Sequence, residues 1–518
     1  MQIIATATGC CRFNDLIMKK FCGSAFFLLL FFCEASAQNQ NFIIINPDDT
    51  HEEIILKAAH VTPSPRQLRW QQLELTAFLH FGINTFTDRE WGDGTEDAKL
   101  FQPKNLNAEQ WVRICKEAGF KQIILTAKHH DGFCLWPSKF TEHSVKHSSW
   151  KKGRGDVVKE VADACHKYGV GFGVYLSPWD RNSVYYGDSA TYNEYFINQL
   201  TELLTGYGRV DEVWFDGANG EGKNGKKQVY DFERWYQLIR KLQPQAVIAV
   251  MGPDVRWVGT ETGYGRETEW SVLPLSAQNR QQIAAASQTD VAFVPKGDRT
   301  GEDLGSRKKL FSADALIWYP AETDVSIRPG WFYHEKENEK VKTPEKLLDI
   351  YFHSVGRNGV LLLNIPPDKN GLIHKTDSAA LLRFKELREK LFARNLLQQA
   401  KVKSSNGKNR KALLDEKFGS YWTTKKSDTA AIITFRLKGP QTFDVLMLQE
   451  NIAEGQRIEK FVLEAKVDNE WKTITEGTTV GYKRLLRFDP VTANSVRLKI
   501  ISSRLNPTLS EVGVYYSK

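Results

Sequence analysis

Beyond its first forty positions, this 518-residue sequence has little cysteine and no long hydrophobic run. Four of the seven cysteines lie at or before Cys33, which leaves Cys115, Cys134 and Cys165. These three are widely spaced and form no CxxC pair, so they cannot build a disulfide framework, and we expect small buried hydrophobic side chains. No run of about 20 apolar residues follows position 40, which predicts no membrane-spanning helix there.

The sequence also lacks clear signatures of a metal or nucleotide site. No HExxH occurs, and His129 and His130, although suggestive of metal, occupy adjacent strand positions that should point to opposite faces. The stretch GEGKNG (220–225) fits G-x-G-x-x-G, but Asp216 precedes it in the turn and no acidic residue follows about 20 positions on. The net charge of +8 is mostly scattered, as on a solvated surface. We therefore expect no cofactor, no metal and no nucleic-acid partner.

The N-terminus predicts export. From Met18 the sequence reads MKKFCGSAFFLLLFFCEASAQ, with two lysines, a short apolar stretch and a small-x-small ASA at 35–37. This pattern is typical of a signal peptide cleaved after Ala37, with initiation at Met18. Cys33 raises lipid attachment as an alternative, although Phe32 fits poorly before a lipidated cysteine. A periplasmic or extracellular location is expected.

From about residue 70, apolar runs alternate with amphipathic segments. The apolar runs predict strands at 75–83, 120–133, 170–180, 210–215 and 246–252. The segments between them predict helices at 108–119, 156–169, 192–208 and 231–243. Near-continuous apolar strands joined by helices are typical of a parallel sheet, and at least five such units favour an α/β fold of the (β/α)₈-barrel type.

The pattern loosens after residue 253, so the barrel is expected to be irregular. Further strands are expected at 291–295, 314–320 and 359–367, with helices at 342–356 and 380–397. Beyond 398, short alternating runs divided by turns predict a β-sandwich. The expected organisation is a signal peptide (1–37), a barrel domain (38–397) and a β-sandwich (398–518).

Polar and aromatic side chains gather where the predicted strands end. They are His80, His129, His130, Asp131, Tyr175, Trp179, Asp216 and, a little beyond the fifth strand, Glu261. In a barrel of this type the carboxyl ends of the strands build the active site, and this mixture suits a sugar pocket. A plainer interpretation stays open, because an aspartate after a strand is often a turn former and a core histidine often only satisfies a hydrogen bond.

Several motifs resemble glycoside hydrolase family 29, the retaining α-L-fucosidases. They are FLHFGINTF (78–86), EWGDG (90–94), AGFKQIILTAKHHDGFCLW (118–136), GVYLSPWDRN (173–182), EVWFDGANG (212–220) and RPGWFYH (328–334). GPDVRWVGTETG (252–263) is similar to the subgroup that acts on α-1,3/1,4-linked fucose. The resemblance implies fucosylated oligosaccharides or glycoconjugates as substrates.

The resemblance also implies residue roles. Asp216 would be the nucleophile and Glu261 the acid/base, with Glu267 and Glu269 as rivals for the second role. The implied sugar contacts are His80, Glu90, Trp91, His129, His130, Tyr175 and Trp331, the last as an apolar wall for the C6 methyl group.

The C-terminal stretches ALLDEKFGSYWTT (412–424) and VRLKIISSRLNPTLSEVGVYY (496–516) resemble discoidin-type, galactose-binding-like jelly rolls. Such a domain could bind sugar or simply stabilise the barrel. Two other functions remain open: a carbohydrate-binding protein on an inactive glycosidase scaffold, and a barrel glycosidase for another sugar such as an α-galactoside. The sequence does not indicate the oligomeric state.

Overall fold

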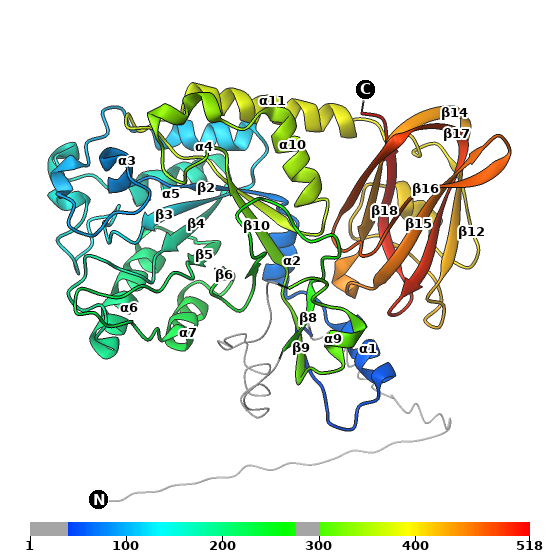
Figure 1. Cartoon of the computed structure of the whole chain (residues 1–518), viewed down its shortest axis with the longest axis horizontal. Coiled ribbons are helices and arrows are strands. Elements are labelled where there is room, and N and C mark those ends of the chain that lie inside the picture. The colour runs from blue at the N-terminus through cyan, green and yellow to red at the C-terminus, as the bar shows by residue number, and fades with distance from the viewer. Residues whose placement is uncertain (1–39, 276–300, 518) are drawn as a thin grey trace, which may run out of the picture. The chain divides into compact units, whose positions relative to one another are not determined.

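The computed structural model describes residues 40–275 and 301–517, which form a parallel barrel followed by an antiparallel β-domain (Figure 1). The predicted signal peptide and the predicted strand at 291–295 lie outside the described residues. Within the described ranges, no helix has the length and apolar character needed to cross a membrane.

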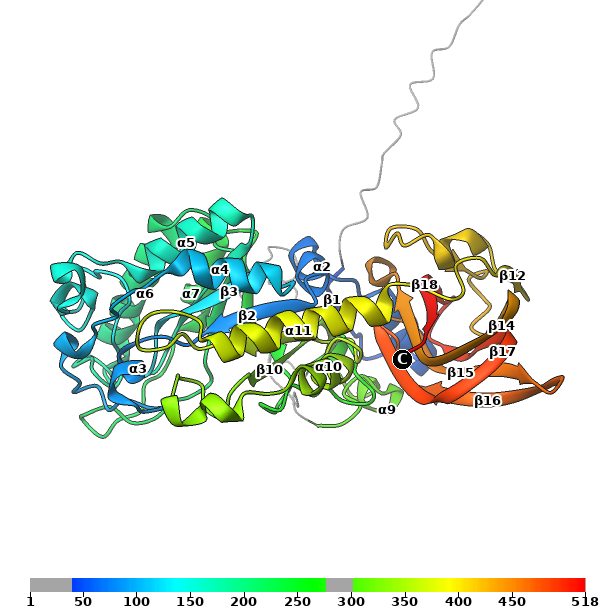
Figure 2. The ribbon, with the colours of Figure 1, turned by 90° about the horizontal axis from the view of Figure 1, so that it is seen from above.

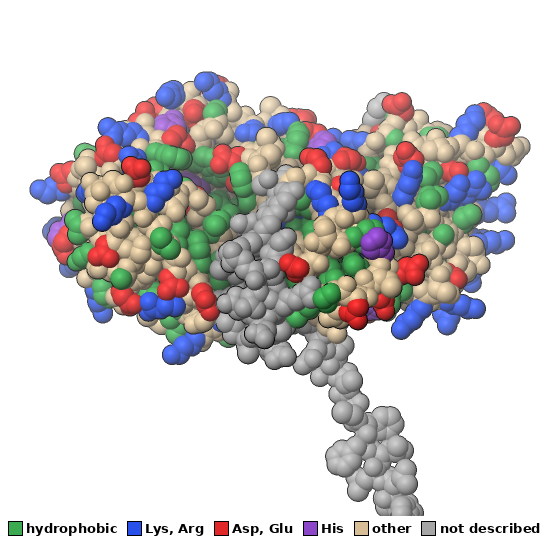
Figure 3. Space-filling view, turned by 60° about the horizontal axis from the view of Figure 1, so that its bottom comes forward, with side chains coloured by type: hydrophobic (Ala, Val, Ile, Leu, Met, Phe, Trp, Pro, Cys, Tyr) green, Lys and Arg blue, Asp and Glu red, His purple; other side chains and the backbone are tan. Residues whose placement is uncertain are grey.

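On the face seen in Figure 3, Lys and Arg lie interspersed with Asp and Glu over the barrel.

Eight parallel strands build the barrel, in the hydrogen-bonded order β6-β5-β4-β3-β2-β11-β10-β7. A parallel bridge between Ala249 and Val255 brings the two ends of this order together, so the ring is nearly closed. The strands are β2 (Leu75–Leu79), β3 (Gln122–Lys128), β4 (Gly171–Leu176), β5 (Glu212–Phe215), β6 (Val247–Val250), β7 (Arg256–Trp257), β10 (Ala321–Ser326) and β11 (Val360–Asn364). The predicted barrel class is confirmed, and its irregularity lies between β6 and β7, which a short loop joins in place of a helix.

Helices lie along the outside of the strands (Figure 2). The principal ones are α2 (Pro65–Gln71), α4 (Ala108–Glu117), α5 (Val157–Tyr168), α6 (Ser189–Gly206), α7 (Phe232–Leu242), α10 (Pro344–His353) and α11 (Lys375–Phe392). Shorter ones are α1 (His51–His60), α3 (Ile83–Thr87), α9 (Arg307–Leu310) and the 3₁₀ turns η1 (Ala98–Leu100), η2 (Val145–His147), η3 (Trp150–Gly153) and η4 (Glu335–Lys340). The boundaries of α5 could be predicted because its capping residues are typical ones. The Asp156 side chain accepts from Lys159 N at the start of the helix, and Gly169 ends the helix with a positive φ of 66°.

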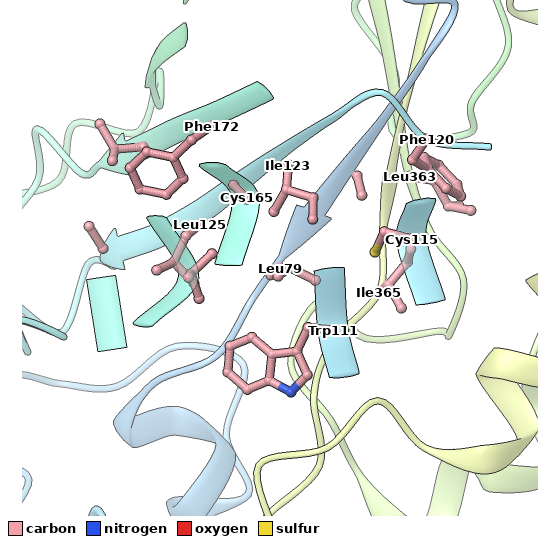
Figure 4. Packing of buried hydrophobic residues seen from close by; sticks show 14 of the residues in the cluster. Leu79, Trp111, Cys115, Phe120, Ile123, Leu125, Cys165, Phe172, Leu363 and Ile365 are labelled. Carbon is pink, nitrogen blue, oxygen red and sulfur yellow. The ribbon is translucent and has the colours of Figure 1, made fainter. Parts of the chain in front are cut away.

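The main hydrophobic core lies between the helices and the outer faces of the strands. Figure 4 shows Trp111 and Cys115 of α4 and Cys165 of α5 packed beside strand side chains such as Ile123 and Leu363. Cys134 is buried as well, which confirms the prediction that Cys115, Cys134 and Cys165 are small buried side chains. A second cluster, which includes Trp70, Phe78, Tyr175 and Trp214, fills the inside of the barrel.

A strand forms within 314–320 as predicted, but it does not belong to the barrel. Strand β9 (Ala315–Trp318) instead joins β1 (Phe42–Ile44) and β8 (Val272–Leu275) in a separate antiparallel sheet. The barrel position belongs to β10, which directly follows and pairs with β11 and β7. Its sequence, AETDVS, carries the buried carboxyl groups Glu322 and Asp324, so it does not read as an apolar strand.

The C-terminal domain is a seven-stranded antiparallel sheet in the order β13-β18-β14-β17-β15-β16, with β12 paired to β14. Its elements are β12 (Lys401–Ser404), η5 (Arg410–Leu414), β13 (Trp422–Thr423), β14 (Ala431–Glu450), η6 (Ile452–Glu454), β15 (Ile458–Val467), β16 (Glu470–Gly477), β17 (Arg484–Ser503) and β18 (Thr508–Tyr515). The two 20-residue strands contain register shifts, which allow a long strand to bend around its own core.

Candidate active site

A cavity of about 430 Å³ lies at the carboxyl ends of the barrel strands. It is lined by Trp214, Asp216, Gly217, Ala218, Val250, Met251, Trp257, Glu261 and Asp324. Asp216 and Glu261, the two carboxylates assigned catalytic roles by resemblance, therefore lie in one cavity. This is the end of the barrel at which enzymes of this architecture carry their active sites.

Asp216 directly follows β5 and is held by two hydrogen bonds. Its Oδ1 accepts from Ala218 N at 2.7 Å and its Oδ2 accepts from the Tyr175 hydroxyl at 3.2 Å. The side chain remains 26% exposed. The carboxylate is thus fixed in direction and still accessible from the cavity, as a nucleophile must be.

Glu261 lies in the loop that follows β7. Its Oε2 accepts from Trp331 Nε1 at 3.2 Å, and Gly263 N donates to Asp324 O at 3.0 Å, which ties the loop to β10. Gly263 adopts φ 75°, and a Cβ there would lie 2.8 Å from Val325 and Ile350, so the close approach requires glycine. The glycine thereby brings Glu261 to the edge of the cavity.

The two rival glutamates lie elsewhere. Glu267 pairs with Arg484 of the C-terminal domain and with Arg357 at 2.6 Å. Glu269 is 1% exposed and pairs with Arg256 and Arg266. Both side chains are engaged by arginines where the barrel contacts the C-terminal domain, and neither lines the cavity.

His80 is buried at the end of β2 with a fixed orientation. Asn364, the last residue of β11, accepts from both His80 N at 3.2 Å and His80 Nδ1 at 2.9 Å. Nδ1 is therefore the protonated ring nitrogen, and Nε2 is left as an acceptor. Burial lowers the pKa of His80 to about 3, so the ring is neutral and can accept a hydrogen bond from a sugar hydroxyl.

His129 and His130 lie side by side rather than on opposite faces, contrary to the sequence prediction. Both follow Lys128, the last residue of β3, and the alternation of a strand no longer applies; their ring centroids are 4.2 Å apart. His130 Nδ1 contacts Ser177 Oγ at 2.7 Å, and its Nε2 lies 3.8 Å from Asp216 Oδ2. Burial lowers the pKa of both rings. No cluster of three metal-ligating side chains occurs in residues 40–275 and 301–517.

Glu90 supports the site through the backbone of another loop. Its carboxylate accepts from Trp331 N at 2.7 Å, from Phe332 N at 3.2 Å and from His334 Nε2 at 2.7 Å. It thereby fixes Trp331, whose ring lies 5.1 Å from that of His80. His334, which sequence reasoning did not single out, bridges Asp88 and Glu90.

Trp91 is the most exposed of the predicted sugar contacts, with 56% of its surface accessible. Its ring stands edge-on to His130, with centroids 5.4 Å apart, and to Trp179 at 5.8 Å. The aromatic pair therefore extends the site outward from Asp216. An exposed indole in such a place can cover the apolar face of a sugar ring.

A buried ion pair that sequence reasoning missed supports the histidine turn. Lys128 Nζ donates to Asp180 Oδ2 and to Gln199 Oε1, both at 2.9 Å. Burial acts to raise the pKa of Asp180, but the Lys128 ammonium holds it below its ordinary value. Asp180 also accepts from Ser183 N at 2.8 Å, so the pair joins the end of β3 to the loop after β4.

Lys128→Met should lower the free energy of unfolding by about 3–5 kcal/mol, because it leaves the Asp180 carboxylate buried without its cation. Urea denaturation measures the change. Lys159→Met is the matched control: this exposed residue of α5 pairs with Asp163 at 2.9 Å, and its loss should cost less than about 1 kcal/mol. Equal effects of the two substitutions would contradict a structural role for Lys128.

Comparison with known proteins agrees with the architecture. Residues 68–386 match the family model described as alpha-L-fucosidase, and residues 398–511 match the F5/8 type C domain. Alpha-L-fucosidase 1 of Arabidopsis thaliana is 45% identical over 467 residues, 88% of each chain.

Solved structures are similar as well. A Bacteroides ovatus protein provisionally named an α-L-fucosidase is 54% identical, with a TM-score of 0.82 over 92% of this chain and 78% of its own. A Ruminococcus gnavus family 29 fucosidase crystallised with fucose is 33% identical, with a TM-score of 0.77 over 88% of this chain and 95% of its own. The chain thus belongs to the α-L-fucosidases of glycoside hydrolase family 29, a hydrolase barrel with a C-terminal F5/8 type C domain.

Proposed function

We propose that this α-L-fucosidase hydrolyses terminal α-1,3- or α-1,4-linked fucose with retention of configuration. The observation that carries the proposal is the shared cavity of Asp216 and Glu261, with the neutral rings of His80, His129 and His130 gathered near Asp216. A retaining glycosidase needs two carboxyl groups that flank the glycosidic bond. The Ruminococcus gnavus relative was also crystallised with fucose as an Asp-to-Ala variant, which is in keeping with an essential aspartate.

In the proposed reaction Asp216 attacks the anomeric carbon while Glu261 protonates the departing oxygen. Glu261 then accepts a proton from water, which attacks the same carbon and releases Asp216. Asp216 must be ionised and Glu261 protonated at the start. Tyr175 and Ala218 N hold the two oxygens of Asp216, so the nucleophile needs little reorganisation.

The neighbouring side chains suit a deoxy sugar. His80, His129 and His130 lie neutral and buried, so they can bond hydroxyl groups without attracting a charged ligand. Trp331 lies beside His80 and gives an apolar surface for the C6 methyl group. A methyl group alone discriminates only modestly, so the hydroxyl contacts must supply most of the selectivity for fucose.

The linkage preference rests on the loop GPDVRWVGTETG, which resembles the α-1,3/1,4 subgroup and which places Glu261 at the cavity. It is tested with trisaccharides that carry fucose through α-1,3 or α-1,4 bonds, an α-1,2-linked one, an aryl α-L-fucoside and an aryl α-galactoside. Fucose should be released mainly from the first two. Strong aryl-fucoside turnover would favour a broad-specificity enzyme, and α-galactoside turnover would contradict the sugar assignment.

The stereochemistry is tested on the same reactions. Proton NMR in the first minutes, before mutarotation, should show α-L-fucose as the first product. β-L-Fucose as the first product would show inversion of configuration, and the reaction would then be a single displacement rather than a double one.

We further propose that the chain is exported and cleaved after Ala37. The lysine-flanked apolar segment and the ASA motif support this. Mass spectrometry of the exported protein should give an N-terminus at Gln38. A lipid-modified Cys33 would indicate membrane anchoring.

A further inference from the structure

Two glutamate side chains lie inside the barrel. Glu212 is the first residue of β5 and Glu322 is the second residue of β10; both are 0% exposed. Neither lines the cavity of Asp216 and Glu261. Their surroundings are the apolar side chains of the barrel interior, where an uncompensated charge is costly. The reaction proposed above makes no use of either residue.

The hydrogen bonds of the two carboxyl groups leave one oxygen of each group without a donor. Glu212 Oε2 accepts from Trp70 Nε1 at 3.0 Å and from Gln122 Nε2 at 2.6 Å. Glu322 Oε1 accepts from Trp214 Nε1 at 2.7 Å. The remaining oxygens, Glu212 Oε1 and Glu322 Oε2, are buried without a hydrogen-bond partner in the described part of the chain, and each glutamate raises or lowers the pKa of the other as a close neighbour does. Two neighbouring carboxyl groups can satisfy such oxygens together only with a proton between them.

The donors also indicate which group is the acid. Glu212 receives two N–H bonds and Glu322 receives one, so the negative charge is better stabilised on Glu212 and the O–H lies on Glu322. Burial raises the pKa of both groups, so the pair keeps at least one proton at neutral pH.

The charged groups around the pair do not neutralise it. Just before β5, Asp211 adds negative charge beside Glu212, and on β10 Asp324 is a further acidic neighbour of Glu322. The groups that face the pair from α2, β3 and the middle of β5 are the uncharged side chains of Trp70, Gln122 and Trp214. Among the described residues, neither glutamate has a lysine or arginine within ion-pair distance.

Two basic residues at this end of the barrel have other partners. Lys121 Nζ donates to Gln72 O at 2.9 Å, and Arg209 Nε donates to Asp211 Oδ1 at 2.6 Å. The shared proton is thus the means by which two carboxyl groups are accommodated in the barrel interior.

Trp214 connects this pair to the active site. Its N–H is fixed by Glu322, and its ring lines the cavity together with Asp216. The ring also packs at 4.9 Å from Tyr175, which bonds Asp216, and at 5.1 Å from Phe78, which contacts His80. A rotation of this indole would therefore disturb both sides of the sugar site.

We propose that Glu212 and Glu322 share a single proton and act together as positioning residues that hold Trp214 against the fucose-binding cavity. The proposal rests on the proposed function only in that fucose occupies the cavity beside Asp216. Trp214 would contact the sugar, and the glutamates would act through it. A consequence is that the folded protein carries one proton that the unfolded chain releases.

The proton count is tested with Glu322→Gln. The amide oxygen can accept from Trp214 and the amide nitrogen can donate to Glu212, so all hydrogen bonds persist with no proton to lose. Glu212 then has three N–H donors, which favour its charged form. In the folded wild type both glutamates have raised pKa values, so the retained proton stabilises the folded state at low pH. This stabilisation is lost as the pH rises from the ordinary glutamate pKa toward the raised pKa values of the pair.

Urea unfolding between pH 5 and 8 measures this. The unfolding constant of the wild type, divided by that of Glu322→Gln, should rise about tenfold per pH unit. Glu345→Gln, at an exposed residue in the first turn of α10, should give a ratio independent of pH. A pH-independent ratio for Glu322→Gln as well would overturn the shared proton.

The positioning role is tested by inhibition with fucose. Glu322→Gln should keep the wild-type inhibition constant within about threefold, whereas Glu322→Leu removes the acceptor of Trp214 and should weaken fucose binding about tenfold or more. Wild-type affinity in Glu322→Leu, or equal losses in the two variants, would overturn the role. If Glu322→Leu does not fold, the unfolding of Glu322→Gln between pH 5 and 8 still tests whether the two glutamates share a proton. Absence of fucose inhibition in the wild type would instead count against the proposed function, and the unfolding series does not depend on it.

Discussion

Asp216→Ala should abolish turnover of α-L-fucosides while the protein stays folded. Removal of the nucleophile of a hydrolase can cost on the order of 10⁶-fold in kcat. The fold should survive because the side chain lies partly exposed at the end of β5 and its partners, Ala218 N and the Tyr175 hydroxyl, border the cavity. Initial rates and a thermal unfolding curve on the same preparation give the two measurements.

The variant should recover activity with azide. Alanine leaves a space beside the anomeric carbon, and with an activated donor such as an aryl α-L-fucoside azide can attack from that side. The product should be β-L-fucosyl azide, because a single displacement inverts the configuration. Asp216→Asn is the matched control: the amide fills the same space without acting as a nucleophile, so azide should restore much less activity.

A second control shows whether the loss of activity is specific to Asp216 or follows from substitution of any aspartate next to β5. Asp211 stands just before β5, at its opposite end, where it pairs with Arg209 and accepts from Phe172 N. Asp211→Ala should keep near wild-type kcat. Full activity of Asp216→Ala, or a fluorinated fucosyl inactivator that labels another residue, would place the nucleophile elsewhere.

Much of the barrel could be predicted because its strands are buried on both faces. A strand such as β6, buried along its whole length, is continuous in apolar residues, and the ends of a helix such as α5 are marked by Asp156 and Gly169. Strand β10 breaks that rule with Glu322 and Asp324. Its partners are indole N–H groups of Trp214 and Trp257, which only the closed barrel brings near.

The strand ends of the candidate site were predictable, whereas the residues that orient them were not. His80 directly follows a strand, but its partner Asn364 is 284 residues away and carries no local signal. The choice among Glu261, Glu267 and Glu269 was equally hidden, because three nearby glutamates look alike in sequence. It depends on long-range contacts, such as that of Glu267 with Arg484 in the C-terminal domain.

Glu261→Ala should lower activity by an amount that depends on the leaving group. A trisaccharide releases a poor leaving group and needs its proton, so the loss should be about 10²–10⁴-fold, the usual contribution of a general acid. An activated aryl fucoside needs no such proton in the first step, but the fucosyl-enzyme is then hydrolysed slowly without a general base. Stopped-flow assays should show a rapid burst of aryl alcohol followed by a slow steady state with a lowered KM.

Azide distinguishes the two carboxylates by the configuration of the product. In Glu261→Ala azide replaces the water that attacks the fucosyl-enzyme, so two inversions give α-L-fucosyl azide, the opposite anomer to that expected from Asp216→Ala. Glu267→Ala is the matched control: its partners are Arg484 and Arg357, so it should reduce stability and keep kcat/KM on both substrates. If Glu267→Ala gave the burst and the α-azide while Glu261→Ala did not, the acid/base would be Glu267, and the loop after β7 would need another arrangement during the reaction.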